Sequence, residues 1–106
     1  MKVICSTVIR AAEQGSVHGG LYVIDVDNDE VIKHIPYAGE FDNENVRGGE
    51  RGLRGIAVLE DKIVVADSSG LLELDRNTYE ITNQKQDRGF FKSVHEICYF
   101  DNHIWV

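Results

Sequence analysis

The stretch IAVLEDKIVVADSSGLLELD, residues 56–75, decides the fold class. It holds three short runs of Val, Ile, Leu and Ala, which are separated by Glu60-Asp61 and by the polar residues before Gly70. Short runs of this composition bounded by Asp, Asn or Gly are typical of β-strands that are joined by tight turns. The stretch therefore predicts three consecutive antiparallel strands.

The same pattern continues in both directions along the 106 residues, and it predicts an all-β protein. No window of about 11 residues or more has the 3.6-residue period of an amphipathic helix. Residues 8–14 are the single short helical candidate, and they lack a clear cap. The nine expected strands are residues 1–8, 21–24, 30–35, 56–59, 62–66, 70–74, 78–82, 96–100 and 103–106.

The strands repeat, and the repeat has the length of a propeller blade. Residues 56–65 align without gaps on 97–106, and residues 20–25 align on 70–75. Residues 2–5 align on 62–65 in the same way. A four-stranded unit of roughly 40–50 residues is the signature of β-propeller blades. With strands A to D numbered from the central axis outward, the chain contains B-C-D, then A-B-C-D, then A-B.

This organisation divides the chain into five expected segments. They are an incomplete first blade (1–36), a long loop (37–55), a complete second blade (56–82), a second loop (83–95) and the start of a third blade (96–106). Two blades and a part leave apolar faces open. We therefore expect either a piece of a longer propeller or a homo-oligomer, such as a trimer that closes a six-bladed ring. The last strand, residues 103–106, would be redundant in such a ring, and this favours a piece of a longer propeller.

Three motifs carry a resemblance to a known repeat family. They are Arg54-Gly55-Ile56-Ala57-Val58, Lys62-Ile63-Val64-Val65-Ala66-Asp67-Ser68 and Gly70-Leu71-Leu72-Glu73-Leu74-Asp75. Together they resemble an NHL-type repeat, and residues 21–36 are similar to the related YVTN-type propeller repeat. Thr7 departs from the NHL pattern, because it stands where the second unit has Asp67. The resemblance implies propeller blades and leaves the function open.

Loop lengths predict where a ligand or partner binds. The long connections are 9–19, 37–55 and 83–95, and in a propeller all three belong to the same face. The connections expected on the opposite face, such as Glu60-Asp61 and Asp101-Asn102, are tight. Insertions concentrate where binding occurs, because a rigid scaffold tolerates them there.

Charged residues near the start of strand A are the best candidates within that face. Arg54 and His95 occupy equivalent repeat positions, and such a pair can grip a carboxylate or a phosphate. The alternative is that these residues cap strand ends and bond loop carbonyls. The candidate ligand-binding residues are Arg54, His95, Glu96, Arg51, His18 and Arg10.

These features favour a cofactor-free binding or interaction module for a protein or a small anionic ligand, and not an enzyme. One alternative is part of a six-bladed hydrolase that resembles metal-dependent lactonases, with Glu96 and His95 near a divalent cation such as Ca²⁺. A single carboxylate is few for such a site. A further alternative is an assembly component whose blade faces form its interface.

Charge and cysteine content exclude some classes of partner. The formal net charge of −7 disfavours nucleic acids and anionic membranes as partners. No apolar run approaches the ~20 residues of a transmembrane helix. Cys5 and Cys98 lie far apart without metal-ligand spacing, so we expect two thiols in a reducing, cytoplasmic compartment.

Overall fold

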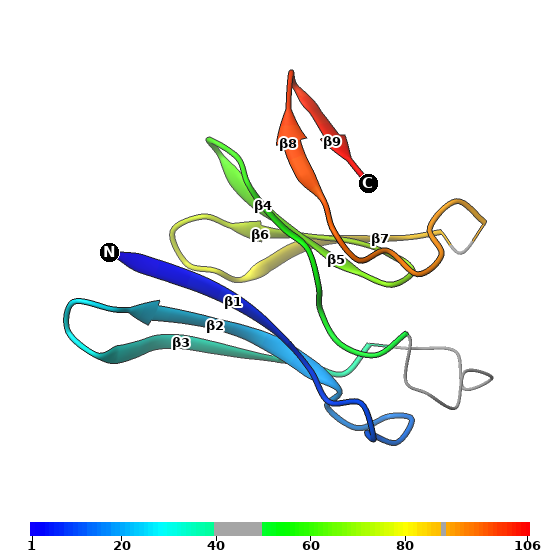
Figure 1. Ribbon diagram of the computed structural model, residues 1–106, viewed down its shortest axis with the longest axis horizontal. Helices are drawn as coiled ribbons and strands as arrows, with labels where there is room; N and C mark the ends of the chain where they lie inside the picture. The colour runs from blue at the N-terminus through cyan, green and yellow to red at the C-terminus, as the bar shows by residue number, and fades with distance from the viewer. Residues whose placement is uncertain (40–49, 88) are drawn as a thin grey trace. The chain divides into compact units, whose positions relative to one another are not determined.

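The structure is a computed structural model that describes residues 1–39, 50–87 and 89–106 (Figure 1). Over these residues the chain forms β-strands and turns and no helix, so the predicted all-β class is confirmed. The helical candidate at residues 8–14 begins with Val8, the last residue of a strand, and continues as a loop from Ile9. Its first turn is closed by the bond from Ala12 N to Ile9 O, and Ile9 N itself bonds across the loop to His18 O at 2.8 Å.

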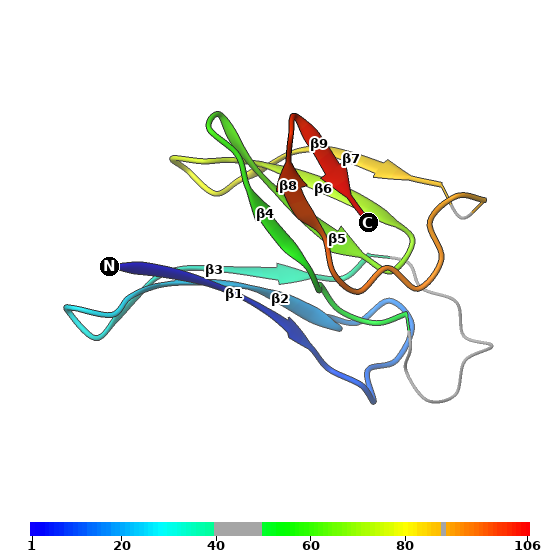
Figure 2. The same ribbon diagram turned by 45° about the horizontal axis from the view of Figure 1, so that its top comes forward.

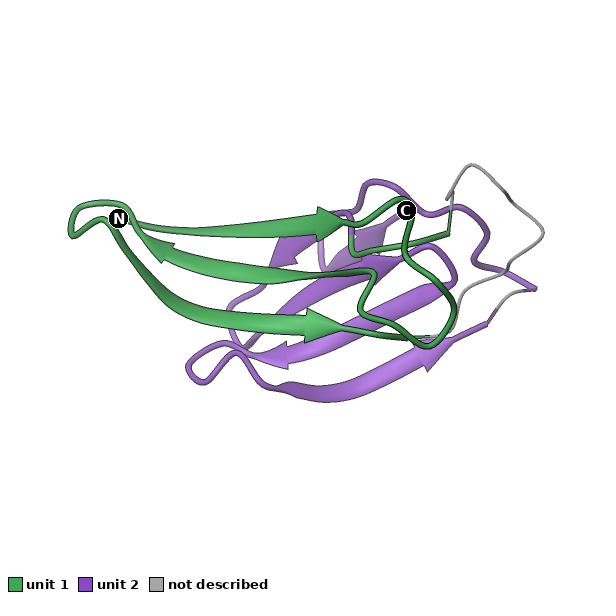
Figure 3. Cartoon of the chain, turned by 90° about the horizontal axis from the view of Figure 1, so that it is seen from below, with its two compact units in different colours: residues 1–53 green, residues 54–106 purple. Residues whose placement is uncertain are grey.

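The described strands form three antiparallel sheets, with three, four and two strands in chain order. The first sheet contains β1 (Lys2–Val8), β2 (Gly19–Asp25) and β3 (Glu30–Tyr37). The second contains β4 (Ile56–Val58), β5 (Lys62–Asp67), β6 (Gly70–Asp75) and β7 (Ile81–Gln86). The third is the hairpin of β8 (Cys98–Phe100) and β9 (His103–Trp105). The chain divides into two compact units, residues 1–53 and 54–106 (Figure 3).

The first two sheets share one pairing register. In the β1–β2 pair Lys2 lies opposite Asp25, and in the β5–β6 pair Lys62 lies opposite Asp75. The correspondence holds pair by pair along both strands, up to Gly20 in the first sheet and Gly70 in the second. It extends to the outer strands. The β2–β3 pairing shifts its register between Val23 and Ile24, and the β6–β7 pairing shifts at the equivalent place, between Glu73 and Leu74.

The turns that follow β2 and β6 also match. Asp25 Oδ1 accepts hydrogen bonds from the backbone N–H groups two and three residues later, and Asp75 Oδ1 does the same. Asp29 and Tyr79 then take positive φ angles, of 53° and 61°. An aspartate that bonds its own turn in this way stabilises the turn against extension. For this reason β7 begins at Ile81, and the expected strand at 78–82 is wrong in its first half.

Replacing Asp75 by asparagine is expected to reduce the loss of unfolding free energy that occurs when the pH is lowered. The N–H of Thr78, followed by that of Asn77, holds the pKa of the Asp75 carboxyl below its ordinary value of 3.8. A carboxyl with a lowered folded-state pKa adds stability above pH 3.8, and this is lost as pH falls through the folded-state pKa. Urea midpoints at pH 7 and pH 2.5 should therefore differ less in Asp75→Asn than in the wild type.

Asp61→Asn is the matched control, because it removes the same charge from the neighbouring β4–β5 turn. It should keep the wild-type difference between the two urea midpoints. If both variants show the same pH dependence, the bonds to Asp75 Oδ1 contribute nothing to acid stability.

Other boundaries also differ from the sequence-based expectation. Strand β8 begins at Cys98, so the expected strand at 96–100 is wrong in its first two residues, and β2 begins at Gly19, two residues earlier than expected. Strand β3 continues through Pro36, which lies opposite Gly20. This is possible because β3 bonds only to β2 within the described residues, and an edge strand tolerates a residue without an N–H. Strand β7 extends to Gln86, so the loop expected from residue 83 begins at residue 87.

The β8–β9 hairpin repeats the register of β4–β5 and packs on the second sheet (Figure 2). Tyr99 lies opposite Ile104 as Val58 lies opposite Ile63. A core of buried side chains joins the hairpin to the sheet, with Ile104 half-buried against it. The buried members of this core are Ala57, Val64, Ala66, Val94 and Ile97.

Candidate functional site

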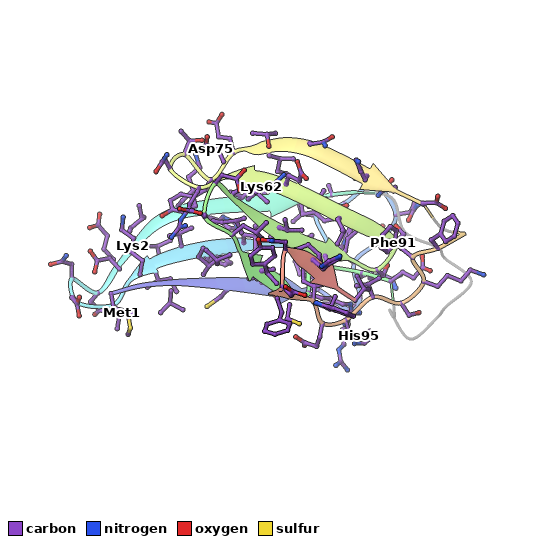
Figure 4. All side chains as sticks on the ribbon, turned by 90° about the horizontal axis from the view of Figure 1, so that it is seen from above. Met1, Lys2, Lys62, Asp75, Phe91 and His95 are labelled. Atoms are coloured by element: carbon purple, nitrogen blue, oxygen red, sulfur yellow. The ribbon has the colours of Figure 1, made fainter. Side chains whose placement is uncertain are left out.

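Within residues 54–106, the long connection lies at one end of the four-stranded sheet and the tight turns lie at the other (Figure 4). Figure 4 shows Lys62 and Asp75 at the tight-turn end, and Phe91 and His95 at the opposite end. Antiparallel pairing accounts for this arrangement. The β7 strand ends at the same end of the sheet as the β5–β6 turn, so the connection that follows β7 starts there.

Backbone hydrogen bonds hold the long-connection end together. Arg54 N donates to Ala66 O at 2.8 Å, and Gly55 N donates to His95 O at 2.8 Å. Val94 N donates to Ser68 O at 3.2 Å. Residues 54–55, the β5–β6 turn and the 94–95 segment therefore form one connected platform.

Three of the predicted residues, Arg54, His95 and Glu96, lie on this platform. The two segments that carry them touch at Gly55, where an added Cβ would lie 2.5 Å from Ile97 N and 2.9 Å from Glu96 Cα. The side chains of His95 and Glu96 are exposed and that of Arg54 is half-buried. The platform therefore carries an arginine, a histidine and a glutamate on two segments that touch.

Asp67 is a buried carboxylate at the same end that the sequence did not single out as a site residue. It is 3% exposed, and its Oδ1 accepts the Ser69 N–H at 2.7 Å. Its Oδ2 accepts from Gln86 Nε2 at 3.2 Å. The signal that could have identified it is its position, as the first charged residue after the apolar run of β5. These contacts order the β5–β6 turn, on which the 94–95 segment rests.

His18, which was predicted as a ligand-binding candidate, is 1% exposed and joins three loop segments of residues 1–53. Its Nδ1 accepts the Gly52 N–H at 2.7 Å, and its Nε2 lies 2.5 Å from Gly39 O. Because Nδ1 accepts, Nε2 carries the proton and donates to that carbonyl. The imidazole of His18 thus connects backbone groups of two loop segments, and we leave His18 out of the binding proposal.

Arg51 and Arg10 also belong to residues 1–53, so the six candidates divide between the two units. Arg51 is half-buried, and its Nε donates to Ala12 O at 2.7 Å, whereas Arg10 is exposed. Of the predicted binding loop 37–55, residues 40–49 lie outside the described residues, as does Arg88 of the 83–95 loop.

Replacing His18 by leucine is expected to lower the free energy of unfolding by about 2 kcal/mol. The substitution keeps the volume but leaves the Gly52 N–H and the Gly39 carbonyl without their imidazole partner, and unsatisfied buried groups cost ~1–3 kcal/mol. Urea denaturation followed by circular dichroism measures the loss. His95→Leu, at an exposed position, should change stability by less than ~0.5 kcal/mol. Equal stability of His18→Leu and the wild type would contradict a structural role for His18.

No group of three or more His, Cys, Asp or Glu side chains suited to a metal ion occurs within residues 1–39, 50–87 and 89–106. In the part of the chain that the structure describes, no helix has the length and apolar character needed to cross a membrane. Comparison with protein-family models, curated proteins and solved structures found no significant match.

Proposed function

We propose that this protein is a propeller-type binding module whose long-connection end receives a small anionic ligand or an acidic group of a partner protein. The observation that carries the proposal is the platform on which Gly55 N bonds His95 O, because it brings the segment that carries Arg54 against the segment that carries His95 and Glu96. Loops that a rigid sheet positions are the usual place of binding residues. The common register of the first two sheets supports their interpretation as blades.

The chemistry of the platform favours small anions. A guanidinium binds carboxylate or phosphate through paired, charge-assisted hydrogen bonds, and an imidazole adds a donor near neutral pH. Glu96 and the net charge of −7 oppose a long polyanion such as a nucleic acid. The ligand class that fits best is therefore a compact carboxylate or phosphate.

A titration of the ¹⁵N-labelled protein with inorganic phosphate, and separately with acetate, tests the proposal. The amide signals of residues 54–55 and 94–96 are expected to shift with a saturable dependence on ligand concentration. Arg54→Ala should weaken binding at least tenfold, and His95→Ala should weaken it as well.

Lys2→Ala is the matched control, because Lys2 is an exposed cation at the tight-turn end of the first sheet. It should leave the titration curves unchanged. Shifts that spread over both ends of the sheets, or that survive in Arg54→Ala, would show non-specific ion binding and would refute the proposed site.

A further inference from the structure

Strand β1 has one edge to which no described strand bonds. It pairs with β2 alone within the described residues, whereas the equivalent strand β5 pairs with β4 on one side and β6 on the other. Because Lys2–Asp25 and Lys62–Asp75 share a register, the edge of β1 to which no described strand bonds corresponds to the edge of β5 that binds β4. The first sheet thus has the place for a strand of the β4 type.

A strand of that type is present at the other end of the chain. Strand β8 corresponds to β4, since Tyr99 pairs with Ile104 in the register in which Val58 pairs with Ile63. Its partner β9 therefore occupies the same repeat position as β1. Strand β9 spans only His103–Trp105, with two of its three side chains exposed. A two-stranded hairpin of this length is marginally stable by itself.

We propose that β8 of one molecule pairs with β1 of a second copy of this chain and takes β1 in place of its own β9. The register follows from the β4–β5 pair, in which Val58 lies opposite Ile63 and Ala57 lies opposite Val64. It places Tyr99 opposite Val3 of the second copy, and Cys98 opposite Ile4. The product is a four-stranded sheet, β8–β1–β2–β3, with the strand order of β4–β7.

The side chains of the first sheet fit this role. Successive residues of a strand face opposite sides, so Val3, Cys5, Tyr22 and Ile24 share one face, because Val3 pairs with Ile24 and Cys5 with Tyr22. This apolar face is only half-buried. Its repeat counterparts are 2% exposed or less, and they are Ile63, Val65, Leu72 and Leu74.

The second sheet offers the surface that this face requires. The hairpin covers part of the apolar core of Ala57, Val64 and Ala66, and Leu71 at its side stays half-buried. A four-stranded sheet in place of the two-stranded hairpin extends that cover over β6. Burial of apolar area and completion of a sheet edge therefore favour the same partner, a second copy of the chain.

A designed disulfide tests the proposed register. The Leu59 N–H donates to Lys62 O, so the adjacent Val58–Ile63 pair is not hydrogen-bonded, and such pairs have the shorter Cα separation that a disulfide needs. Its proposed counterpart is Tyr99 with Val3. The variant is therefore Val3→Cys/Tyr99→Cys in a Cys5→Ser/Cys98→Ser background. Mild oxidation should give covalent oligomers longer than dimers on a denaturing gel, and dithiothreitol should return them to monomers.

Two controls define the register. Each single cysteine variant can give only dimers, because a chain with one thiol forms one bridge. Val3→Cys/Phe100→Cys is shifted by one residue, which places the two thiols on opposite faces, and it should give no oligomer ladder. Circular dichroism of the reduced variants checks that they fold.

Light scattering of the unmodified chain gives a second, independent measurement. A mass that is a defined multiple of 11.9 kDa, with dissociation on dilution, is expected. A monomer at all concentrations would overturn the proposal, as would a disulfide that forms only within one chain. Neither result depends on anion binding at Arg54, so this proposal and the proposed function fail separately.

Discussion

Replacement of Gly70 by alanine is expected to lower the free energy of unfolding by about 3 kcal/mol or more. Gly70 is the first residue of β6 and lies opposite Gln86 of β7. An added Cβ would overlap the carbonyl oxygen of Lys85 and lie 2.9 Å from the Cα of Gln86. Backbone atoms cannot rotate away as a side chain does, so the two strands must separate, and overpacking of this kind is costly.

Two other glycines provide comparisons for Gly70→Ala, one at the equivalent position of the first sheet and one in an open loop. Gly20 is the counterpart of Gly70 in the first sheet, where a Cβ would meet the carbonyl oxygen of Ile35 at 2.6 Å. Gly20→Ala should therefore be severely destabilising as well. At Gly89 the nearest atom is the flexible Asp87 carboxylate at 3.0 Å, and Gly89→Ala should be nearly neutral. If the three variants have equal urea midpoints, the close approach of β6 to β7 is not as described.

Truncation of Leu72 to alanine is the second large effect, with an expected loss of about 3 kcal/mol. Leu72 lies in the interior strand β6, opposite Val65 on one side and Gln84 on the other, and its side chain is 0% exposed. Loss of a fully buried leucine side chain costs ~2–5 kcal/mol, because transfer free energy and a residual cavity both contribute.

Leu71→Ala is the matched comparison for Leu72→Ala. Leu71 is the preceding residue in β6, it faces the other side of the sheet, and it is only half-buried. Its truncation should cost about half as much. Urea denaturation of both variants, monitored by circular dichroism and tryptophan fluorescence, measures the difference. A larger loss for Leu71 than for Leu72 would contradict the described burial of β6.

The strands of this chain are predictable from sequence because short apolar runs alternate with turn residues, and pairing partners are adjacent along the chain. Strand β7 shows the limit of that approach. Thr78 and Tyr79 have strong β-propensity, yet the bonds from the Asp75 carboxylate to the Asn77 and Thr78 N–H groups turn the chain there. A local hydrogen bond thus displaces a strand that propensity alone would place earlier.

The candidate site was only partly accessible to sequence reasoning, and the reason is distance along the chain. The repeat identifies Arg54 and His95 as equivalent positions, but the bond from Gly55 N to His95 O depends on how the β8–β9 hairpin packs on the second sheet. The role of His18 depends on backbone groups of Gly39 and Gly52, which are 21 and 34 residues away. No local pattern encodes such partners.

The common register of the two sheets also bears on how the chain folds. Strands β1 and β5 have the same pairing pattern, so either of them can pair in register with β2 or with β6. A folding chain can therefore form the wrong pair. Connection length decides the competition. Ser68 and Ser69 alone join β5 to β6, whereas residues 9–18 separate β1 from β2, and closing a short loop costs less entropy. We therefore expect the β5–β6 hairpin to form first and to remove the competing strand. Lengthening its turn should slow refolding and populate a misfolded intermediate.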